Sequence, residues 1–155
     1  MGNHLVQLDY PLDIKEALKL AASVRREAQA YVDGRYPTMD FSHWQIFRLQ
    51  NSFTHKIIED FNVEGKPRFY WLAPNTTIPY HVDHNTTCSI NFLLTTPAVP
   101  VTFEGDNKYE YTQALLNTSV RHKVVNGNHE RILLKISIFN ETYEQLAERI
   151  KYKKI

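Results

Sequence analysis

Three side chains of this sequence are of the types that together bind a catalytic metal ion. His81 and Asp83 are separated by one residue in a β-rich stretch, and His122 follows 39 residues after Asp83. Two imidazoles and one carboxylate are the ligand set of a facial-triad non-haem Fe(II) site. Side chains at positions i and i+2 of a strand share a face, so His81 and Asp83 should project together. The pattern predicts a metal site whose third ligand, His122, comes from another strand.

The same residues also allow a purely structural interpretation. A His-x-Asp pattern is short enough to arise by chance in a chain of 155 residues. His81 and Asp83 could equally form a hydrogen-bonded pair at a strand end, and His122 could be a solitary histidine within a strand. Residues 131–138 favour the metal site, because their pattern predicts a polar pocket.

Residues 131–138 predict a strand with one apolar face and one mixed face. The apolar positions are Ile132, Leu134, Ile136 and Ile138, and the alternate positions are Arg131, Leu133, Lys135 and Ser137. An arginine on the mixed face could bind a carboxylate through its planar fork, although it could equally be a surface residue. Residues 88–94 show the same division, with Ser89 and Asn91 opposite an apolar face. These two side chains are either polar anchors in a pocket or part of an exposed sheet face.

The composition narrows the class of protein. A chain of 155 residues is long enough for one domain with a substantial core and too short for two. A net charge of +1 argues against a nucleic-acid surface or a polybasic membrane patch. The single cysteine, Cys88, excludes an intrachain disulfide. No signal-peptide pattern and no apolar run of about 18 residues is present. We therefore expect a cytoplasmic protein without a membrane or nucleic-acid partner.

Helical periodicity dominates the first third of the sequence. Asp13 is expected to cap a helix that ends near Gly34, and Ser52 to cap a second, shorter helix. Between them, residues 44–49 alternate as a strand does. From Arg68 onward the period is that of strands, which are expected at residues 69–72, 78–83, 88–94, 99–104, 109–113, 120–126 and 131–139. A last helix is expected over residues 143–151.

Short strands at spacings of roughly 8–12 residues, separated by turn residues, are typical of an antiparallel sandwich or barrel. The predicted fold class is therefore α+β, with helices first, then a β-sandwich and then a closing helix. We expect one domain, in which residues 1–66 form a helical support region, residues 67–140 the β core and residues 141–155 the C-terminal helix.

The candidate site residues lie in segments that resemble a known family. Residues 73–83 (APNTTIPYHVD) and 117–126 (NTSVRHKVVN), taken with Arg131, resemble the 2-oxoglutarate/Fe(II)-dependent oxygenases. The resemblance is greatest to the small aspartyl/asparaginyl β-hydroxylase-like branch, and it covers roughly half of the chain, from Arg68 to Phe139. It implies a double-stranded β-helix core, also called a jelly-roll or cupin-like core.

The resemblance also implies roles for individual residues. Fe(II) would bind to His81, Asp83 and His122, and Arg131 would bind the distal carboxylate of 2-oxoglutarate, with ascorbate as a candidate reductant. In the β-hydroxylase branch, a further basic residue on the strand after the first ligands often helps to hold the co-substrate. Here that strand offers only Ser89 and Asn91. A second departure is Leu133, at a position where related oxygenases often have a small hydroxyl residue.

The expected function is hydroxylation of an unactivated C–H bond in an amino-acid side chain of a peptide or protein. The alternatives are hydroxylation of a small metabolite or nucleobase, a cupin-like binding or structural protein without turnover, and a Zn or Mn hydrolase or isomerase on a similar barrel. The sequence predicts neither the identity of the substrate nor the oligomeric state.

Overall fold

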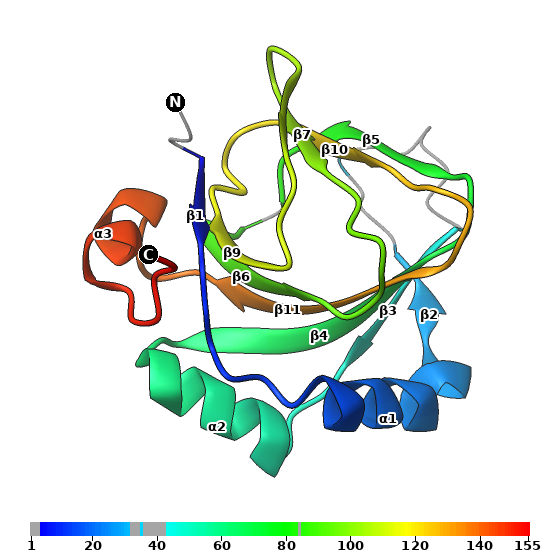
Figure 1. The fold of residues 1–155 in the computed structure, drawn as a ribbon, viewed down its shortest axis with the longest axis horizontal. Helices are drawn as coiled ribbons and strands as arrows, with labels where there is room; N and C mark the ends of the chain where they lie inside the picture. Colours follow the sequence, from blue (N-terminus) through cyan, green and yellow to red (C-terminus); the bar gives the residue numbers. More distant parts are fainter. Residues whose placement is uncertain (1–3, 32–34, 36–42, 84) are drawn as a thin grey trace.

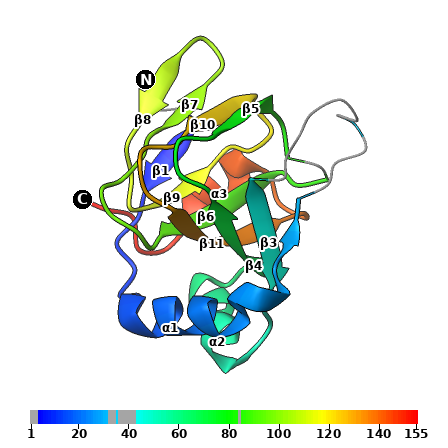
Figure 2. The same cartoon turned by 90° about the vertical axis from the view of Figure 1, so that its right-hand side faces the viewer.

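The computed structural model describes residues 4–31, 35, 43–83 and 85–155. In this part of the chain two antiparallel sheets face each other, and α1 and α2 cover the outer side of the larger one (Figures 1 and 2). The arrangement confirms the predicted α+β class. None of the described helices combines the length and the apolar composition that crossing a bilayer requires.

The larger sheet has seven strands in the order β1-β9-β6-β11-β4-β3-β2, and neighbouring strands are antiparallel. These strands are β1 (Leu5–Gln7), β2 (Gln29–Ala30), β3 (Trp44–Arg48), β4 (Gly65–Leu72), β6 (Cys88–Leu93), β9 (Gln113–Leu116) and β11 (Arg131–Ile138). The smaller sheet has the order β5-β10-β7-β8. Its strands are β5 (Thr77–His81), β7 (Val101–Phe103), β8 (Asn107–Tyr109) and β10 (His122–Val125).

The first helix, α1 (Ile14–Val24), begins as the sequence predicts but is shorter. The Asp13 side chain accepts a hydrogen bond from the Glu16 amide, which caps the helix. A 3-10 helix (Arg25–Glu27) follows, and then Gln29 and Ala30 pair with β3. The predicted extension toward Gly34 is therefore wrong, because pairing in the sheet takes precedence over helix propensity. Gly34 itself lies outside the described residues.

The second helix, α2 (Ser52–Phe61), is capped by Asn51 instead of the predicted Ser52. The Asn51 carboxamide accepts from the Thr54 amide at 3.0 Å, and the Thr54 hydroxyl accepts from the Asn51 amide at 3.1 Å. This reciprocal capping box places Ser52 inside the first turn. The last helix, α3 (Tyr143–Arg149), confirms the prediction for residues 143–151 to within its final turn.

The strand predictions need two main corrections, and two short strands were missed. The strand predicted over residues 78–83 ends at His81, so Asp83 follows the strand instead of belonging to it. Residues 109–113 are not one strand, since β8 ends at Tyr109 and β9 begins at Gln113. The strands β1 and β2 were not predicted. They have three and two residues, which is too short for an alternation to be recognised.

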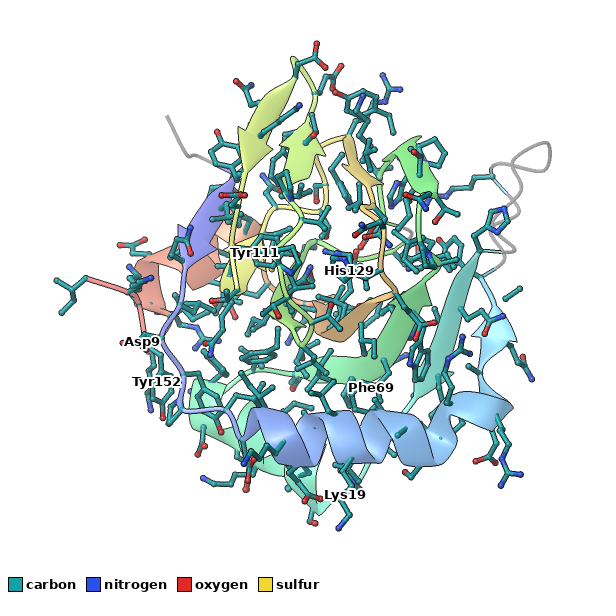
Figure 3. All side chains as sticks on the ribbon, turned by 45° about the vertical axis from the view of Figure 1, so that its right-hand side comes forward. Asp9, Lys19, Phe69, Tyr111, His129 and Tyr152 are labelled. Atoms are coloured by element: carbon teal, nitrogen blue, oxygen red, sulfur yellow. The ribbon has the colours of Figure 1, made fainter. Side chains whose placement is uncertain are left out.

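The outer face of the larger sheet packs against α1 and α2 as an apolar core. Phe69 lies between β4 and α1, whereas Lys19 points away from the sheet (Figure 3). Fully buried side chains of this core include Phe61, Phe69, Trp71, Ile90, Phe92, Leu115, Leu134, Ile136 and Ile138. The predicted apolar face of residues 131–138 belongs to this core.

The inner face of the larger sheet is turned toward the smaller sheet and has a second core. Its buried apolar side chains include Tyr70, Leu72, Leu93, Val101, Phe103, Leu116 and Leu133. Polar side chains share this face and are equally buried: Ser89, Asn91, Arg131, Lys135 and Ser137. The predicted mixed face thus lies inside the molecule, where a functional site can be sheltered from water.

Candidate functional site

The structure brings His81, Asp83 and His122 together at one end of the smaller sheet. His81 is the last residue of β5 and His122 the first residue of β10, and the two are directly paired across the strands. The Asp83 amide donates to the Thr118 carbonyl, which ties the residue just after β5 to the segment before β10. One donor atom from each of the three side chains lies within 4.8 Å of the others.

Their convergence has a different origin from the one that the sequence predicts. The two histidines, not His81 and Asp83, are the pair that strand geometry brings together. Asp83 reaches the same point from the loop, with its Oδ1 at 3.3 Å from His81 Nε2 and 3.2 Å from His122 Nε2. All three side chains are at most 9% exposed.

The orientation of both imidazoles is set by backbone carbonyls. Nδ1 of His81 lies 2.8 Å from the Pro79 carbonyl, and Nδ1 of His122 lies 2.7 Å from the Val120 carbonyl. A carbonyl only accepts hydrogen bonds, so Nδ1 is the donor in each ring. In the neutral imidazole Nε2 then has a free lone pair, and both Nε2 atoms face Asp83. Hydrogen bonding of this kind is how metal-binding histidines are oriented.

The two carboxylate oxygens of Asp83 have different partners. Oδ1 faces the two histidines, and Oδ2 forms an ion pair with the Lys135 ammonium. Burial by itself raises the pKa of Asp83, but Lys135 and the histidines outweigh burial and hold this pKa well below its usual range. Burial lowers the pKa of Lys135, and the Asp83 carboxylate more than reverses that effect. Asp83 is therefore a carboxylate with Oδ1 directed at the histidines.

This donor set fits a divalent metal ion. Two imidazole lone pairs and a carboxylate oxygen converge, and the hydrogen atoms of both rings point away from the point of convergence. A divalent cation at this point would be shared by the two imidazole nitrogens and the anionic oxygen, and it would compensate the buried charge of Asp83. Nitrogen and oxygen ligands in this combination suit Fe(II), Mn(II) or Zn(II).

Arg131 is the first residue of β11 and lies on the same inner face as Lys135. It has no acidic partner among the described residues. Its side chain is buried, and one guanidinium nitrogen donates to the Tyr111 hydroxyl at 3.2 Å. Its Nε is also buried and has no hydrogen-bond partner in the described structure. An uncompensated buried cation is unfavourable. The arrangement therefore fits an anionic ligand, of which a carboxylate is the best geometric match.

The other two predicted anchors are connected to Arg131 through Tyr111. The side-chain Nδ2 of Asn91 donates to the Tyr111 hydroxyl at 3.1 Å, and the Ser89 hydroxyl donates to the side-chain Oδ1 of Asn91 at 2.8 Å. Ser89 and Asn91 are thus buried on the inner face, and the alternative of an exposed sheet face is wrong. Among the described residues, the Ser89 side chain hydrogen-bonds to Asn91 and forms no hydrogen bond with Arg131.

Two residues of the candidate site, Tyr111 and Lys135, were not predicted from the sequence. Lys135 could have been found, because it shares the mixed face with Arg131. Tyr111 lies between β8 and β9, where no alternation marks it, and Figure 3 shows it on the opposite side of the larger sheet from Phe69. Its role in the site depends on contacts with distant parts of the chain.

Comparisons with known proteins identify solved structures that have a similar fold. No protein-family model and no curated protein matches this sequence. Among solved structures, a Trichoplax adhaerens prolyl hydroxylase in complex with a hypoxia-inducible-factor peptide has a TM-score of 0.65 at 8% identity, covering 93% of this chain and 85% of that one. The viral collagen prolyl hydroxylase of Paramecium bursaria Chlorella virus-1, solved as a 2OG complex, has a TM-score of 0.60 at 12% identity, covering 88% and 96%.

The solved structure of a protein with a different activity has a comparable TM-score. The DMSP lyase DddQ of Ruegeria pomeroyi has a TM-score of 0.57 at 12% identity and covers 87% of this chain and 67% of the lyase. At such identities the likeness defines the fold and leaves the chemistry to the site. The chain has the double-stranded β-helix fold that these two prolyl hydroxylases also have, as the sequence resemblance implied.

Proposed function

We propose that this protein is an Fe(II)- and 2-oxoglutarate-dependent dioxygenase that hydroxylates an unactivated C–H bond. The observation that carries the proposal is the buried guanidinium of Arg131, which has no carboxylate partner among the described residues. A metal site alone does not require this cation. A five-carbon diacid held at both ends does, because its distal carboxylate must be neutralised inside the protein.

His81, Asp83 and His122 would hold Fe(II), and Arg131 would hold the distal carboxylate of 2-oxoglutarate. When bound, the metal and co-substrate supply oxidation by dioxygen, in which one oxygen atom enters the substrate C–H bond and the other enters succinate as CO2 is released. Tyr111 positions the Arg131 guanidinium, and Asn91 positions the Tyr111 hydroxyl. Lys135 would keep Asp83 Oδ2 occupied, so that Oδ1 remains the metal-binding oxygen.

The substrate of this proposal is an amino-acid side chain in a peptide or protein. Support comes from the peptide present in the Trichoplax adhaerens complex, whose enzyme has the same fold. The aspartyl/asparaginyl β-hydroxylase-like branch remains our proposal for the nearest relatives, based on the resemblance of residues 73–83 and 117–126. Ascorbate is the proposed reductant that maintains iron as Fe(II).

The proposal is tested at Arg131. Arg131→Ala should retain the fold and Fe(II) but weaken 2-oxoglutarate binding at least about thirtyfold, because removing one partner of a buried charge pair costs about 2–5 kcal/mol. Arg131→Lys should recover only part of the loss, since lysine lacks the planar fork. The measurement is anaerobic titration of 2-oxoglutarate into the Fe(II) protein, followed by the metal-to-ligand charge-transfer band. Arg26→Ala removes an exposed arginine and is the matched control.

Equal affinity of wild type and Arg131→Ala would show that Arg131 does not bind the co-substrate. A second measurement is the formation of succinate from 2-oxoglutarate in the presence of Fe(II) and ascorbate. Metal binding without either signal would favour a metal-dependent lyase, hydrolase or binding protein on the same fold.

A further inference from the structure

Three basic residues lie side by side across three neighbouring strands of the larger sheet. Arg48 of β3 is directly paired with Arg68 of β4, and Arg68 is directly paired with Lys135 of β11. Directly paired residues project from the same face, and neighbouring strands are about 4.8 Å apart. The three side chains therefore form a row, which we call the basic row, on the inner face of the sheet.

Two members of the basic row lack a compensating acid in the described structure. Lys135 is paired with Asp83. Arg68 has a long hydrogen bond to the Tyr70 hydroxyl at 3.5 Å, and neither Arg48 nor Arg68 forms an ion pair with a described carboxylate. Like charges directly opposite each other destabilise a sheet. Arg48 is exposed, so water screens part of this repulsion, and an anion bound between the two guanidinium groups would compensate the remainder.

The basic row lines a cavity that reaches the candidate metal site. The cavity has a volume of about 840 Å³, and its wall includes Arg48, Arg68, Lys135 and Asp83. Lys66 and Arg35 add two more basic residues to the wall, whereas Glu27 is the only acidic residue besides Asp83 among its described lining residues. This volume is within the range of sites for small ligands, and the charge of the wall favours an anion.

The basic row is separate from the place assigned to 2-oxoglutarate. Arg131 and Lys135 are four residues apart on β11, which corresponds to about 13 Å along a strand. Arg131 is absent from the described residues that line the cavity. One end of the inner face of β11 thus has a cation for the co-substrate, and the other end has cations that the co-substrate does not need.

We propose that the substrate has a carboxylate or phosphate group next to the C–H bond that is oxidised, and that Arg48 and Arg68 bind this group. The inference rests on the proposed function and specifies its substrate class. The anion occupies the cavity between β3 and β4, beside Lys135. Its attached carbon then lies toward Asp83 and the metal. An uncharged substrate of the same shape leaves the basic row uncompensated and binds more weakly.

The test compares three probes of similar shape: N-acetyl-L-aspartate N-methylamide, N-acetyl-O-phospho-L-serine N-methylamide and the neutral N-acetyl-L-asparagine N-methylamide. They are titrated under anaerobic conditions into protein loaded with Mn(II) and 2-oxoglutarate, which prevents turnover. Binding is followed by tryptophan fluorescence, because Trp44 lines the cavity. We expect at least one charged probe to bind at least about tenfold more tightly than the asparagine probe. The charged probe with the higher affinity identifies the anionic group.

The variants Arg48→Gln and Arg68→Gln should each remove most of this preference, and Arg68→Lys should retain part of it. Arg26→Gln, which removes an exposed arginine outside the cavity lining, should leave the preference unchanged. Equal binding of all three probes, or no binding by the charged ones, overturns the inference. Mn(II) and 2-oxoglutarate affinities are measured on the same samples. If wild type binds neither, the proposed function fails; if it binds both without an anion preference, only this inference fails.

Discussion

The two faces of the seven-stranded sheet are buried to a similar extent but contain different kinds of side chain. Along β11, the outer face has Leu134, Ile136 and Ile138, each 0% exposed. The inner face of the same strand has Arg131, Lys135 and Ser137, which are 1–6% exposed. Burying apolar groups stabilises the fold, whereas burying polar groups costs free energy unless they have partners. Apolar burial on the outer face therefore stabilises the protein, whereas the inner face combines a second apolar core, which includes Leu133, with the polar residues of the candidate site.

Removing the carboxylate of the triad should have the largest effect on the inner face. Asp83→Ala removes one of three metal ligands, so Mn(II) or Fe(II) affinity should fall at least about 100-fold, more than the 10–100-fold typical of losing an outer partner. Anaerobic calorimetric titration measures the affinity. Asp9→Ala, which removes an exposed acid, is the control and should bind metal as wild type does.

This substitution also leaves Lys135 buried without its partner. If Asp83→Ala does not fold, the double variant Asp83→Ala/Lys135→Met removes both charges and allows the same titration. Wild-type metal affinity in either variant would exclude Asp83 as a ligand and with it the metal site.

Truncation on the outer face should affect stability and leave the site intact. Leu134→Ala should lower the free energy of unfolding by about 3 kcal/mol, within the 2–5 kcal/mol that buried leucine truncations cost. Urea denaturation followed by circular dichroism measures this. Metal affinity of the folded fraction should not change. Val125→Ala, at a position that is 55% exposed, should cost less than about 0.5 kcal/mol. A loss of metal binding in folded Leu134→Ala would mean that the two faces are not independent.

Replacing the unpaired cation of the inner face should have the smallest effect on stability. In the protein without ligands, Arg131→Met should leave the free energy of unfolding unchanged or raise it by about 1 kcal/mol, since an apolar side chain replaces a buried charge that has no acidic partner. Tyr111 would keep its hydrogen bond from Asn91. The measurement is urea denaturation without metal or 2-oxoglutarate. A decrease of more than about 2 kcal/mol in the free energy of unfolding would show that Arg131 has a structural role. The inner face would then also stabilise the fold through this residue.

The alternation of residues 131–138 could be read from the sequence because it is local. Successive side chains of a strand point to opposite faces, so the apolar set and the mixed set follow from composition alone. The candidate metal ligands could also be identified from the sequence, because they are recognised by residue type. The lengths of α1, β5 and the segment 109–113 were predicted less well, because pairing with distant strands determines where those elements end.

The sequence by itself determined which residues could take part in chemistry: His81, Asp83 and His122, together with Arg131 on a strand with one apolar face. Only the tertiary structure decided how they meet. The pairing of His81 with His122, the approach of Asp83 from a loop and the contact of Tyr111 with Arg131 all join segments far apart in the chain. The basic row likewise exists only through the register of β3, β4 and β11. Periodicity encodes the face of a strand, whereas strand order and register arise from the packing of the whole domain.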